Sequence, residues 1–331
     1  MGANRPHGLT RRELLVAGAG AATAALTLRS CIGPTPVDRG LRAAVAILRA
    51  GYDDSLPGAI ESGFSLVPPP DVSGKRVLLK PNLVDLPRED KPVCTHPAVI
   101  VAVAEALRRR GAAEIIVGDG PALQRDAWQI VDAIGLTPLL TQHNLRFIDL
   151  NTDDLMLQPN AGSNLGLAQL YYGQTAWQAD VLISLPKMKT HHWAGVSLSM
   201  KNLFGTVSSL AYGWPRNPFH LHNLHNAVLD FNHTRPADYA IIDGITAMEG
   251  DGPVRGTPVD MGTIVMGDNL PAVDATAARM MGIRAEAIDY LARAAGDLGP
   301  IGENSIEQRG ETIASVQHNF AVDPHQAAIV V

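Results

Sequence analysis

Short, almost continuous apolar runs recur along the chain, and most of them end in a polar or glycine-containing stretch. The runs lie at residues 43–48, 76–80, 114–118, 180–185, 239–243 and 263–266. Strands in a sheet that is covered on both faces are apolar throughout, whereas strands with one solvated face alternate between apolar and polar residues. The pattern therefore predicts a sheet with helices on both of its faces.

Helical periodicity separates several of these strands. From Pro97 to Arg110, apolar residues recur at helical spacing, with proline at the start and Gly111 after the end. Residues 221–231 and the alanine-rich residues 271–281 are further predicted helices. The order strand, helix, strand with short connections is typical of a βαβ unit, whose strands are parallel. We therefore expect an α/β fold with a mostly parallel sheet, helices on both faces and a ligand cleft at the carboxyl ends of the strands.

The amino terminus has a different character from the rest of the chain. Adjacent Arg11 and Arg12, followed by a mildly apolar Ala/Gly-rich stretch, resemble a twin-arginine export signal. An amphipathic first helix with incidental paired arginines is the alternative interpretation. We predict a signal peptide over 1–31, a linker over 32–42 and a single α/β domain over 43–331, within which the polar segment 151–178 is an excursion.

This signal predicts export by the twin-arginine machinery to the periplasm or the cell envelope. Ser30 before Cys31 fits a lipid-anchored cysteine, but Arg29 departs from the usual pattern, so cleavage nearby without a lipid is favoured over anchoring at Cys31. The apolar stretch is too short to span a membrane stably, and no later run is long enough to do so.

Composition excludes several classes of function. The 331 residues carry a net charge of −6, so a broad basic surface for nucleic acid is not expected. The two cysteines cannot supply the four thiolates of a self-ligated iron–sulfur cluster or of an all-cysteine zinc site. The chain has no Walker loop, no Gly-x-Ser-x-Gly elbow and no Gly-x-Gly-x-x-Gly fingerprint.

Lysine is rare and unevenly placed. Of the 27 basic residues 21 are arginine and six are lysine, and Lys187, Lys189 and Lys201 fall within fifteen residues of one another. A lysine ammonium is a compact charge whose pKa moves readily on burial, and crowded lysines lower one another's pKa. One of them could then act as a base or nucleophile near neutral pH. Chance clustering and a solvated face are the alternatives.

Polar residues follow four of the predicted strands. Lys80 and Asn82 follow one, Asp119 another, the segment 187–191 a third and Asp243 a fourth. Because the carboxyl ends of parallel strands meet at one edge of a sheet, we expect these side chains to surround a single cleft. Ordinary Asp-Gly turns and solvated strand ends are the alternative interpretation.

Histidines add further candidates. Of the adjacent His191 and His192 only one can point into the cleft if the chain is extended, and the two-residue rhythm of the lysines favours His191. His96 stands at a helix N-terminus, where imidazole stays neutral and a bound anion is favoured. His222 and His225 are three apart on a predicted helix, which suits either a metal pair or ordinary helix-start histidines.

A set of motifs resembles the Domain-of-Unknown-Function 362 (DUF 362) family over roughly residues 43–285. The motifs are Lys80-Pro-Asn-Leu-Val84, Thr95-His-Pro97, Gly118-Asp-Gly-Pro121, Pro186-Lys-Met-Lys-Thr-His191, Ser199-Met-Lys-Asn-Leu-Phe-Gly205, Asp243-Gly-Ile-Thr-Ala-Met-Glu-Gly-Asp-Gly-Pro253 and Pro271-Ala-Val-Asp274. Many members carry appended ferredoxin-type cysteine motifs, which this chain lacks. The strand, Thr-His-Pro and helix layout is also similar to that of nickel-pincer lactate racemases.

These observations favour an exported enzyme or binding protein whose cleft holds a small anionic ligand, a carboxylate or a phosphate. The candidate catalytic residues are Lys187, Lys189, His191 and Lys201. The candidate ligand-binding residues are Lys80, Asn82, His96, Asp119 and Asn202. A divalent metal is a possible cofactor, with Asp243, Glu249 and His222 as candidate ligands.

Two other interpretations remain open. The chain could be a non-catalytic periplasmic redox accessory or maturation factor that docks to an iron–sulfur partner. Alternatively, the lysines could pair with Asp119, Asp243 and Glu249 in a buried salt-bridge network that binds no ligand.

Overall fold

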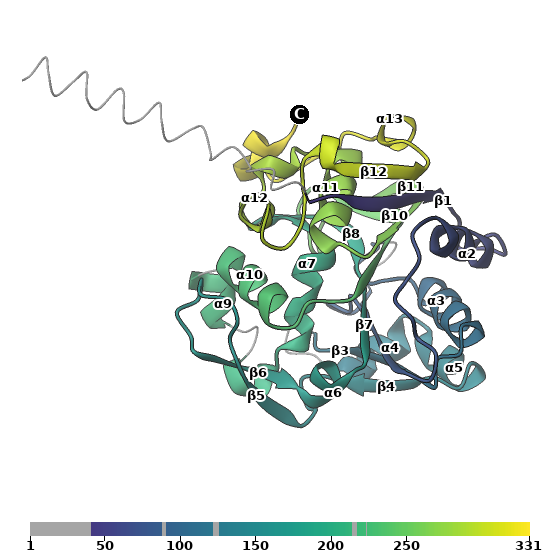
Figure 1. Cartoon of the computed structure of the whole chain (residues 1–331). Coiled ribbons are helices and arrows are strands. Elements are labelled where there is room, and N and C mark those ends of the chain that lie inside the picture. The colour runs from purple at the N-terminus through teal and green to yellow at the C-terminus, as the bar shows by residue number, and fades with distance from the viewer. Residues whose placement is uncertain (1–40, 88–90, 122–125, 214–216, 223) are drawn as a thin grey trace, which may run out of the picture. The chain divides into compact units, whose positions relative to one another are not determined.

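The apolar runs of the sequence assemble into one large sheet in the computed structural model, which describes residues 41–87, 91–121, 126–213, 217–222 and 224–331 (Figure 1). The strands of this sheet are β1 (Ala43–Arg49), β2 (Arg76–Pro81), β3 (Glu114–Asp119), β4 (Arg146–Asp149), β7 (Val181–Leu185), β8 (Lys187–His191), β9 (Gly195–Ser197), β10 (Tyr239–Glu249), β11 (Thr257–Gly267) and β12 (Ile306–Gly310). Their order is β12-β1-β11-β10-β7-β2-β3-β4, with β8 paired to β10 and β9.

Most neighbouring strands are parallel, as the sequence predicts. Strands β10, β7, β2, β3 and β4 pair in parallel in that order, and β12 is parallel to β1. Strand β11 is antiparallel to both of its neighbours, β1 and β10. Because β2, β3, β7 and β10 all run in the same direction, their carboxyl ends lie at the same edge of the sheet.

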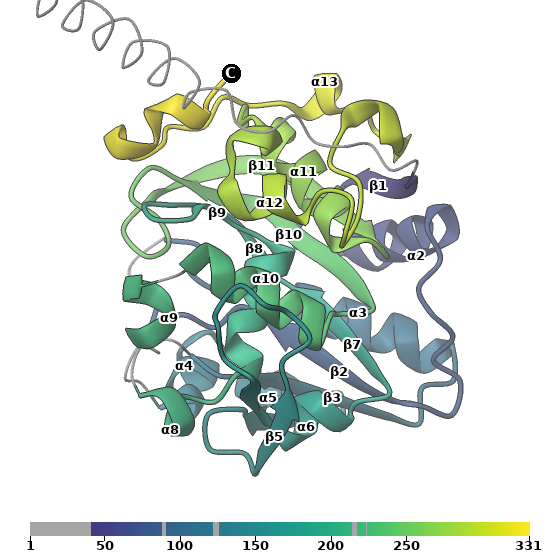
Figure 2. The same ribbon diagram turned by 60° about the vertical axis from the view of Figure 1, so that its left-hand side comes forward.

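Helices cover both faces of the sheet, and this prediction is also confirmed (Figures 1 and 2). One face carries α2 (Leu56–Leu66), α3 (Pro97–Arg109), α4 (Ala127–Ala133) and α5 (Leu136–Gln142). The other carries α6 (Gln174–Gln178), α7 (Ser199–Asn202), α9 (Asn217–His222), α10 (Leu224–Thr234), α11 (Leu270–Met280) and α12 (Asp289–Ala294). Leu78 packs into one apolar cluster while Val77 and Leu79 pack into the other, so β2 is buried on both sides.

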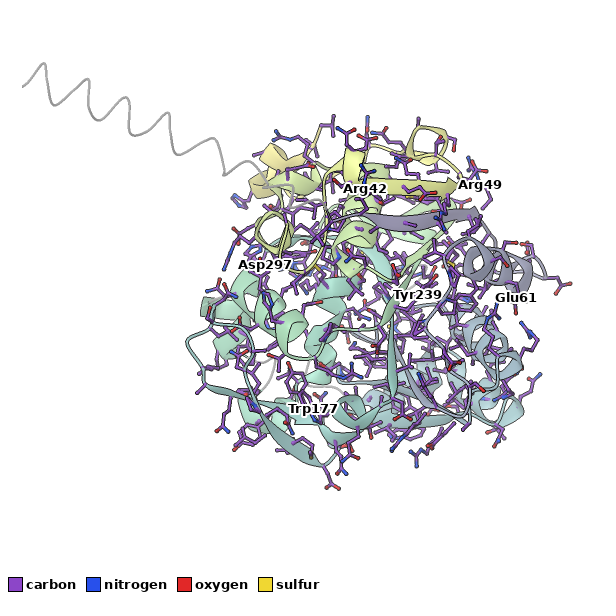
Figure 3. The ribbon with its side chains drawn as sticks, in the orientation of Figure 1. Arg42, Arg49, Glu61, Trp177, Tyr239 and Asp297 are labelled. Carbon is purple, nitrogen blue, oxygen red and sulfur yellow. The ribbon has the colours of Figure 1, made fainter. Side chains whose placement is uncertain are left out.

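Side chains fill the space between the sheet and its helices (Figure 3). Tyr239 illustrates this interior: it is fully buried, and its hydroxyl donates to the carbonyl of Val67 at 2.5 Å. Arg49 and Glu61 lie at the surface, where Glu61 pairs with Arg109. The charged side chains that are buried gather instead near the carboxyl edge of the sheet.

The predicted helices differ from the observed ones mainly at their ends. Helix α3 begins at Pro97, with His96 as the N-cap whose Nδ1 accepts from Ala98 N. Helix α11 begins one residue earlier than expected, and its N-cap is Asn269. The expected helix over 221–231 falls on α9 and α10, which lie on either side of residue 223, outside the described residues.

Strands β10 and β11 are longer than their apolar runs. They pair with each other antiparallel past a bulge between Gly244 and Thr246, where the register resumes with Thr246 opposite Asp260. The second half of β10 and the first half of β11 mix polar and apolar residues. Hydrophobicity alone therefore predicts only the apolar parts, residues 239–243 and 263–266. The backbone pairing between the two strands sets their length.

Segment 151–178 forms a small hairpin of β5 (Leu155–Pro159) and β6 (Gln169–Gly173), followed by α6. The remaining short helices are α8 (Ser209–Tyr212) and α13 (Ile313–Val316). The predicted signal peptide over 1–31, including Cys31, and nearly all of the predicted linker lie outside the described residues. Among the described residues, no helix is both long and apolar enough to cross a membrane.

Candidate ligand-binding site

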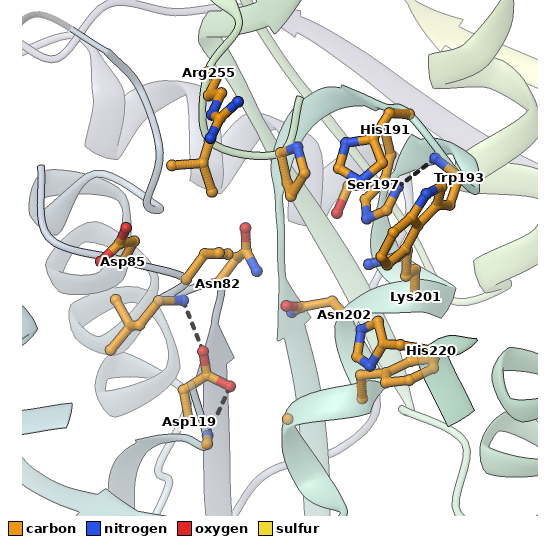
Figure 4. Close-up of a pocket in the computed structure, with 18 of the residues that line it drawn as sticks. Asn82, Asp85, Asp119, His191, Trp193, Ser197, Lys201, Asn202, His220 and Arg255 are labelled. Carbon is orange, nitrogen blue, oxygen red and sulfur yellow. Dashed lines mark hydrogen bonds between the residues drawn. The ribbon is translucent and has the colours of Figure 1, made fainter. Parts of the chain in front are cut away.

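A cavity of about 490 Å³ opens at the carboxyl edge of the sheet (Figure 4). Its walls come from the segment after β2, the end of β3, the turn between β8 and β9, helix α7 with the residues after it, helix α9 and the loop after β10. The lining residues are Lys80, Asn82, Leu83, Val84, Asp85, Asp119, Gly120, His191, His192, Trp193, Ser197, Lys201, Asn202, Phe204, Gly205, His220, Asp251, Pro253, Val254 and Arg255. The predicted cleft therefore exists at the edge where parallel strands end.

The floor of the cavity is a buried ion pair. Lys80 Nζ donates to Asp119 Oδ1 at 2.6 Å and to Asn202 Oδ1 at 3.1 Å. Asp119 also accepts from Gly120 N and, through Oδ2, from Leu83 N at 2.7 Å. The carboxylate thus ties together the segments that follow β2 and β3, and its charge neutralises that of Lys80.

Gly205 allows this pair to lie against the helical segment that follows α7. A Cβ atom at this position would come within 2.0 Å of Asp119 Oδ1 and within 2.7 Å of Lys80 Nζ. Only a residue without a side chain fits there, because a contact this close forces the ion pair to move. The glycine that ends the Ser199–Gly205 motif is explained by this approach.

Helix α7 is held in place by Asp274 of α11. The Asp274 carboxylate is fully buried and accepts from Ser199 N at 2.7 Å, Ser199 Oγ at 2.5 Å and Met200 N at 3.0 Å. These contacts fix the start of the short helix that presents Lys201 and Asn202 to the cavity. Burial raises the pKa of Asp274 to about 7, while its hydrogen bonds oppose that rise.

His191 is a neutral imidazole in this site. Its Nδ1 accepts from Trp193 N at 3.1 Å and from Ala194 N at 3.2 Å, which places the proton of the neutral ring on Nε2. Burial, reinforced by the nearby charge of Lys201, holds its pKa well below the ordinary value of 6.5. His191 can therefore donate a hydrogen bond from Nε2 without carrying a charge.

Lys201 stands on the same side of the cavity. Its side chain is nearly buried, and its Nζ lies over the Phe204 ring at 5.5 Å from the ring centre. Figure 4 places Lys201, Trp193 and His220 on one side of the cavity and Asn82 and Asp85 on the other. An ammonium and an imidazole N–H donor are thus contributed to one site by α7 and by the end of β8.

Asn82 supplies an acceptor from the opposite side. Its backbone N–H donates to Thr95 Oγ1 at 2.9 Å, whereas its Oδ1 is buried and has no hydrogen-bond partner among the described residues. Buried polar atoms in native proteins almost always have a partner. The Asn82 side chain is thus suited to accept a hydrogen bond from a molecule in the cavity.

The turn between β8 and β9 brings both adjacent histidines to the cavity, rather than His191 alone. The alternation of an extended chain ends at this turn, so the predicted separation of the two side chains does not apply. His192 N and Nδ1 both donate to Gly252 O, at 3.2 and 2.7 Å. Gln326 Nε2 donates to His192 O at 3.0 Å, so the carboxyl-terminal segment braces the same turn.

Lys187 and Asp243 form a second buried network that does not line the cavity. Lys187 Nζ lies 2.7 Å from Asp243 Oδ2 and donates to Tyr52 Oη at 2.7 Å, and Tyr52 Oη donates to Asp243 Oδ1 at 2.8 Å. The His96 backbone N–H donates to Asp243 at 2.9 Å, and the His96 ring stacks on Tyr52 with centres 3.8 Å apart. Burial and the Asp243 charge raise the pKa of Tyr52. Lys187, Asp243 and His96 therefore lie together, but in this second network and not in the cavity.

Lys189 is buried separately from both networks. Its Nζ donates to Val93 O at 2.8 Å, and the free thiol of Cys94 is also buried nearby. Burial, together with the charges of Lys201 and Lys187, lowers the pKa of Lys189 to about 7. Lys189 does not line the cavity.

Two of the three candidate metal ligands, Asp243 and Glu249, each have other partners. Asp243 is engaged by Lys187 and Tyr52, and Glu249 accepts from Ala321 N at 2.8 Å near the carboxyl terminus. The side chain of His222 lies outside the described residues. Within the part of the chain that the structure describes, no group of three or more His, Cys, Asp or Glu side chains could hold a metal ion.

Six predicted site residues do meet in the cavity: Lys80, Asn82, Asp119, His191, Lys201 and Asn202. Sequence reasoning missed Trp193, Ser197, Phe204 and Arg255. Trp193 directly follows His191 and His192 in the sequence, and this position could have identified it as a candidate site residue. Arg255 comes from the loop after β10. Its distance from β8 in the sequence does not predict that it lines the same cavity.

The fold and the site together define an α/β protein with a doubly covered, mostly parallel sheet and a charged cavity at its carboxyl edge. Residues 77–279 match the family described as Domain of unknown function (DUF362), and the chain belongs to this family. The resemblance drawn from the sequence motifs is thereby confirmed.

Relatives are known at the level of sequence and of structure. The thylakoid-associated protein sll1697 of Synechocystis is 30% identical over 207 residues, which is 61% of each chain. The lactate racemase apoprotein of Thermoanaerobacterium thermosaccharolyticum has a TM-score of 0.43 at 14% identity, over 74% of this chain and 59% of that one. A Thermotoga maritima protein has a TM-score of 0.36 at 12% identity, over 60% and 50% of the two chains.

Proposed function

We propose that the cavity binds a small organic acid, a carboxylate or a phosphate ester, that also carries a hydrogen-bond donor. Lys201 supplies the positive charge for the acid group, and His191 donates to it from Nε2. The Asn82 side chain accepts from a hydroxyl or N–H group elsewhere on the same molecule. The buried Asn82 Oδ1 without a partner is the observation that carries this proposal.

Lys80 has a supporting part in this proposal rather than a direct one. Its charge is matched by Asp119 at 2.6 Å, so it offers little net attraction to an anion. The same holds for Lys187 beside Asp243. These ion pairs support the internal salt-bridge interpretation for Lys80 and Lys187. We assign Lys201 to the ligand because it lines the cavity together with His191.

The cavity can also support chemistry on the bound acid. A positive charge and a fixed neutral N–H donor, both in a partly enclosed site, stabilise negative charge that develops on a carboxyl group. His191 is suited to donate and not to gain or lose a proton near neutral pH, because both turn amides occupy its Nδ1. We therefore assign it a charge-stabilising role in an enzyme that acts on such an acid.

A thermal-shift panel with the full chain tests the binding proposal. The probes are mandelate, which has a carboxylate and a hydroxyl, mandelamide, which lacks the charge, and phenylacetate, which lacks the hydroxyl. We expect stabilisation in the order mandelate, phenylacetate, mandelamide, since at equal concentration the ligand that binds more tightly raises the melting temperature more. Lys201→Met removes the response to both acids and Asn82→Ala removes the advantage of mandelate over phenylacetate.

Lys75→Met is the matched control, because Lys75 does not line the cavity. Equal responses to mandelate and mandelamide in the wild-type protein would exclude recognition of the acid group. An unchanged mandelate response in Lys201→Met would exclude Lys201 as the residue that recognises it.

We also propose that the protein is exported by the twin-arginine route. The adjacent Arg11 and Arg12 ahead of the apolar stretch support this location. Replacement of both by lysine, which keeps the charge, is expected to retain the protein in the cytoplasm when the cells are fractionated. Equal export of the wild-type and Lys-Lys forms would contradict the proposal.

A further inference from the structure

We propose that the organic acid carries an aromatic ring and that this ring stacks on Trp193. The inference rests on the proposed function and names the class of substrate that the same cavity takes. Three features of the cavity carry it: its volume, the state of the Trp193 indole and the apolar side chains of its lining.

The cavity is too large for a simple anion alone. Its volume is about 490 Å³, whereas one water molecule in the liquid occupies about 30 Å³. Pockets of this size ordinarily enclose most of the surface of a molecule with an extended apolar body. A carboxylate or phosphate group held by Lys201 would leave most of the space for the rest of the ligand.

Trp193 provides a fixed aromatic surface at this cavity. The residue is 51% exposed although the residues on either side of it, His192 and Ala194, are more buried. Its backbone N–H is bonded to His191 Nδ1, and the His192 ring meets the indole nearly perpendicularly, at 84° and 4.7 Å between centres. The turn is anchored to Gly252 and Gln326, so the indole is presented without a large conformational cost.

Apolar side chains line the cavity from two further segments, which also contribute the charged residues Asp85, Asp251 and Arg255. Leu83 and Val84 come from the segment after β2, and Pro253 and Val254 come from the loop after β10. Phe204 adds an aromatic ring to the lining and lies under the Lys201 ammonium, with 5.5 Å between Nζ and the ring centre. A flat apolar ring between Trp193 and these apolar side chains places its acid group beside Lys201 and His191.

Titration calorimetry with mandelate and hexahydromandelate tests the inference at pH 7. The two acids differ only in the aromaticity of the ring, so charge, hydroxyl group and approximate size are matched. We expect mandelate to bind at least about threefold more tightly, as expected of an aromatic pair compared with burial of apolar area alone. Trp193→Leu should reduce that ratio to about one, and Trp193→Phe should restore part of it.

Trp128→Leu is the control for the loss of an exposed indole. Trp128 is 46% exposed and belongs to α4, outside the cavity. Its replacement should leave the ratio between the two acids unchanged. If Trp193→Leu keeps the wild-type ratio, stacking on Trp193 is excluded.

The inference and the proposed function can fail separately. If both acids bind equally and both depend on Lys201, the cavity binds organic acids but does not select aromatic ones. If neither acid binds to the wild-type protein at millimolar concentration, both proposals are wrong.

Discussion

Lys80 Nζ and Asp119 Oδ1 lie 2.6 Å apart at the floor of the cavity, with side chains only 1% and 3% exposed. Lys80 comes from the end of β2 and Asp119 from the end of β3, two strands that pair in parallel. A charged pair this deeply buried stabilises the fold only while both partners are present. The Lys80–Asp119 pair therefore holds the ends of β2 and β3 together and also forms the floor of the cavity.

Loss of one partner in this pair is expected to be costly. We predict that Asp119→Ala lowers the free energy of unfolding by about 3–5 kcal/mol, because it leaves the Lys80 ammonium buried without a counter-charge. The double variant Lys80→Met/Asp119→Ala, compared with the single variants Lys80→Met and Asp119→Ala, should recover much of that loss. Urea denaturation of the wild type, the two single variants and the double variant measures the coupling, and purely additive effects would contradict it.

The Tyr52 hydroxyl should matter for stability and not for ligand binding. It bridges Lys187 and Asp243 in the network that does not line the cavity. Tyr52→Phe removes these hydrogen bonds, and we expect a loss of about 1–3 kcal/mol in the free energy of unfolding. Mandelate affinity should stay within about twofold of the wild type. A large loss of affinity at unchanged stability would place this network in the site.

The lowered pKa of Lys189 predicts that the free energy of unfolding depends on pH. Burial lowers its pKa to about 7 in the folded protein, whereas the ordinary value is 10.5. Between these two values the unfolded chain binds a proton that the folded chain does not, so this group makes the protein more stable as the pH rises. At or below pH 7 the folded protein bears the cost of a buried charge.

Lys189→Met removes this pH-dependent contribution. The stability of the variant relative to the wild type should be greatest at or below pH 7 and should fall as the pH is raised toward 10. Loss of the hydrogen bond to Val93 O adds a constant cost at every pH. Denaturation at pH 6.5 and 9.5 measures the difference, and a difference independent of pH would show that Lys189 keeps an ordinary pKa.

Much of the fold could be predicted from the sequence, because strands that are buried on both faces are continuous apolar runs. The run Arg76–Lys80 is apolar between its charged ends, and it forms a strand buried on both sides. Helix α3 was predictable since proline, cations and glycine mark its ends. Helix α2 was not predictable, because Gly58 and Gly63 weaken its helical pattern. Gly63 allows Met266 to pack closely, since the Met266 Sδ would lie 2.1 Å from an added Cβ.

The site was predictable only in part. Parallel strands bring Lys80 and Asp119 to one edge, and that relation follows from topology alone. The separation of Lys187 from Lys80 does not, because it depends on which carboxylate packs beside each ammonium, Asp243 for Lys187 and Asp119 for Lys80. Arg255 enters the cavity through a loop whose path is set by the β10–β11 pairing, and no local pattern encodes that path.

His191 should not give a pH-dependent change in affinity near neutrality. Its pKa lies well below 6.5, because it is buried and close to Lys201. We therefore expect the dissociation constant of mandelate, which stays ionised throughout, to change with pH between 6 and 8 in the same way, within about twofold, in the wild type and in His191→Asn. A stepwise weakening over this range, abolished in His191→Asn, would show that the charged imidazole recognises the acid.

The claim that Lys201 recognises an organic acid is tested most directly by titration calorimetry at pH 7 with mandelate. The prediction is saturable one-to-one binding to the wild type and to Lys75→Met, and at least about a tenfold loss of affinity in Lys201→Met, as expected when a charged partner is removed from a bound acid. Equal affinity in Lys201→Met and the wild type, at equal melting temperatures, would contradict it.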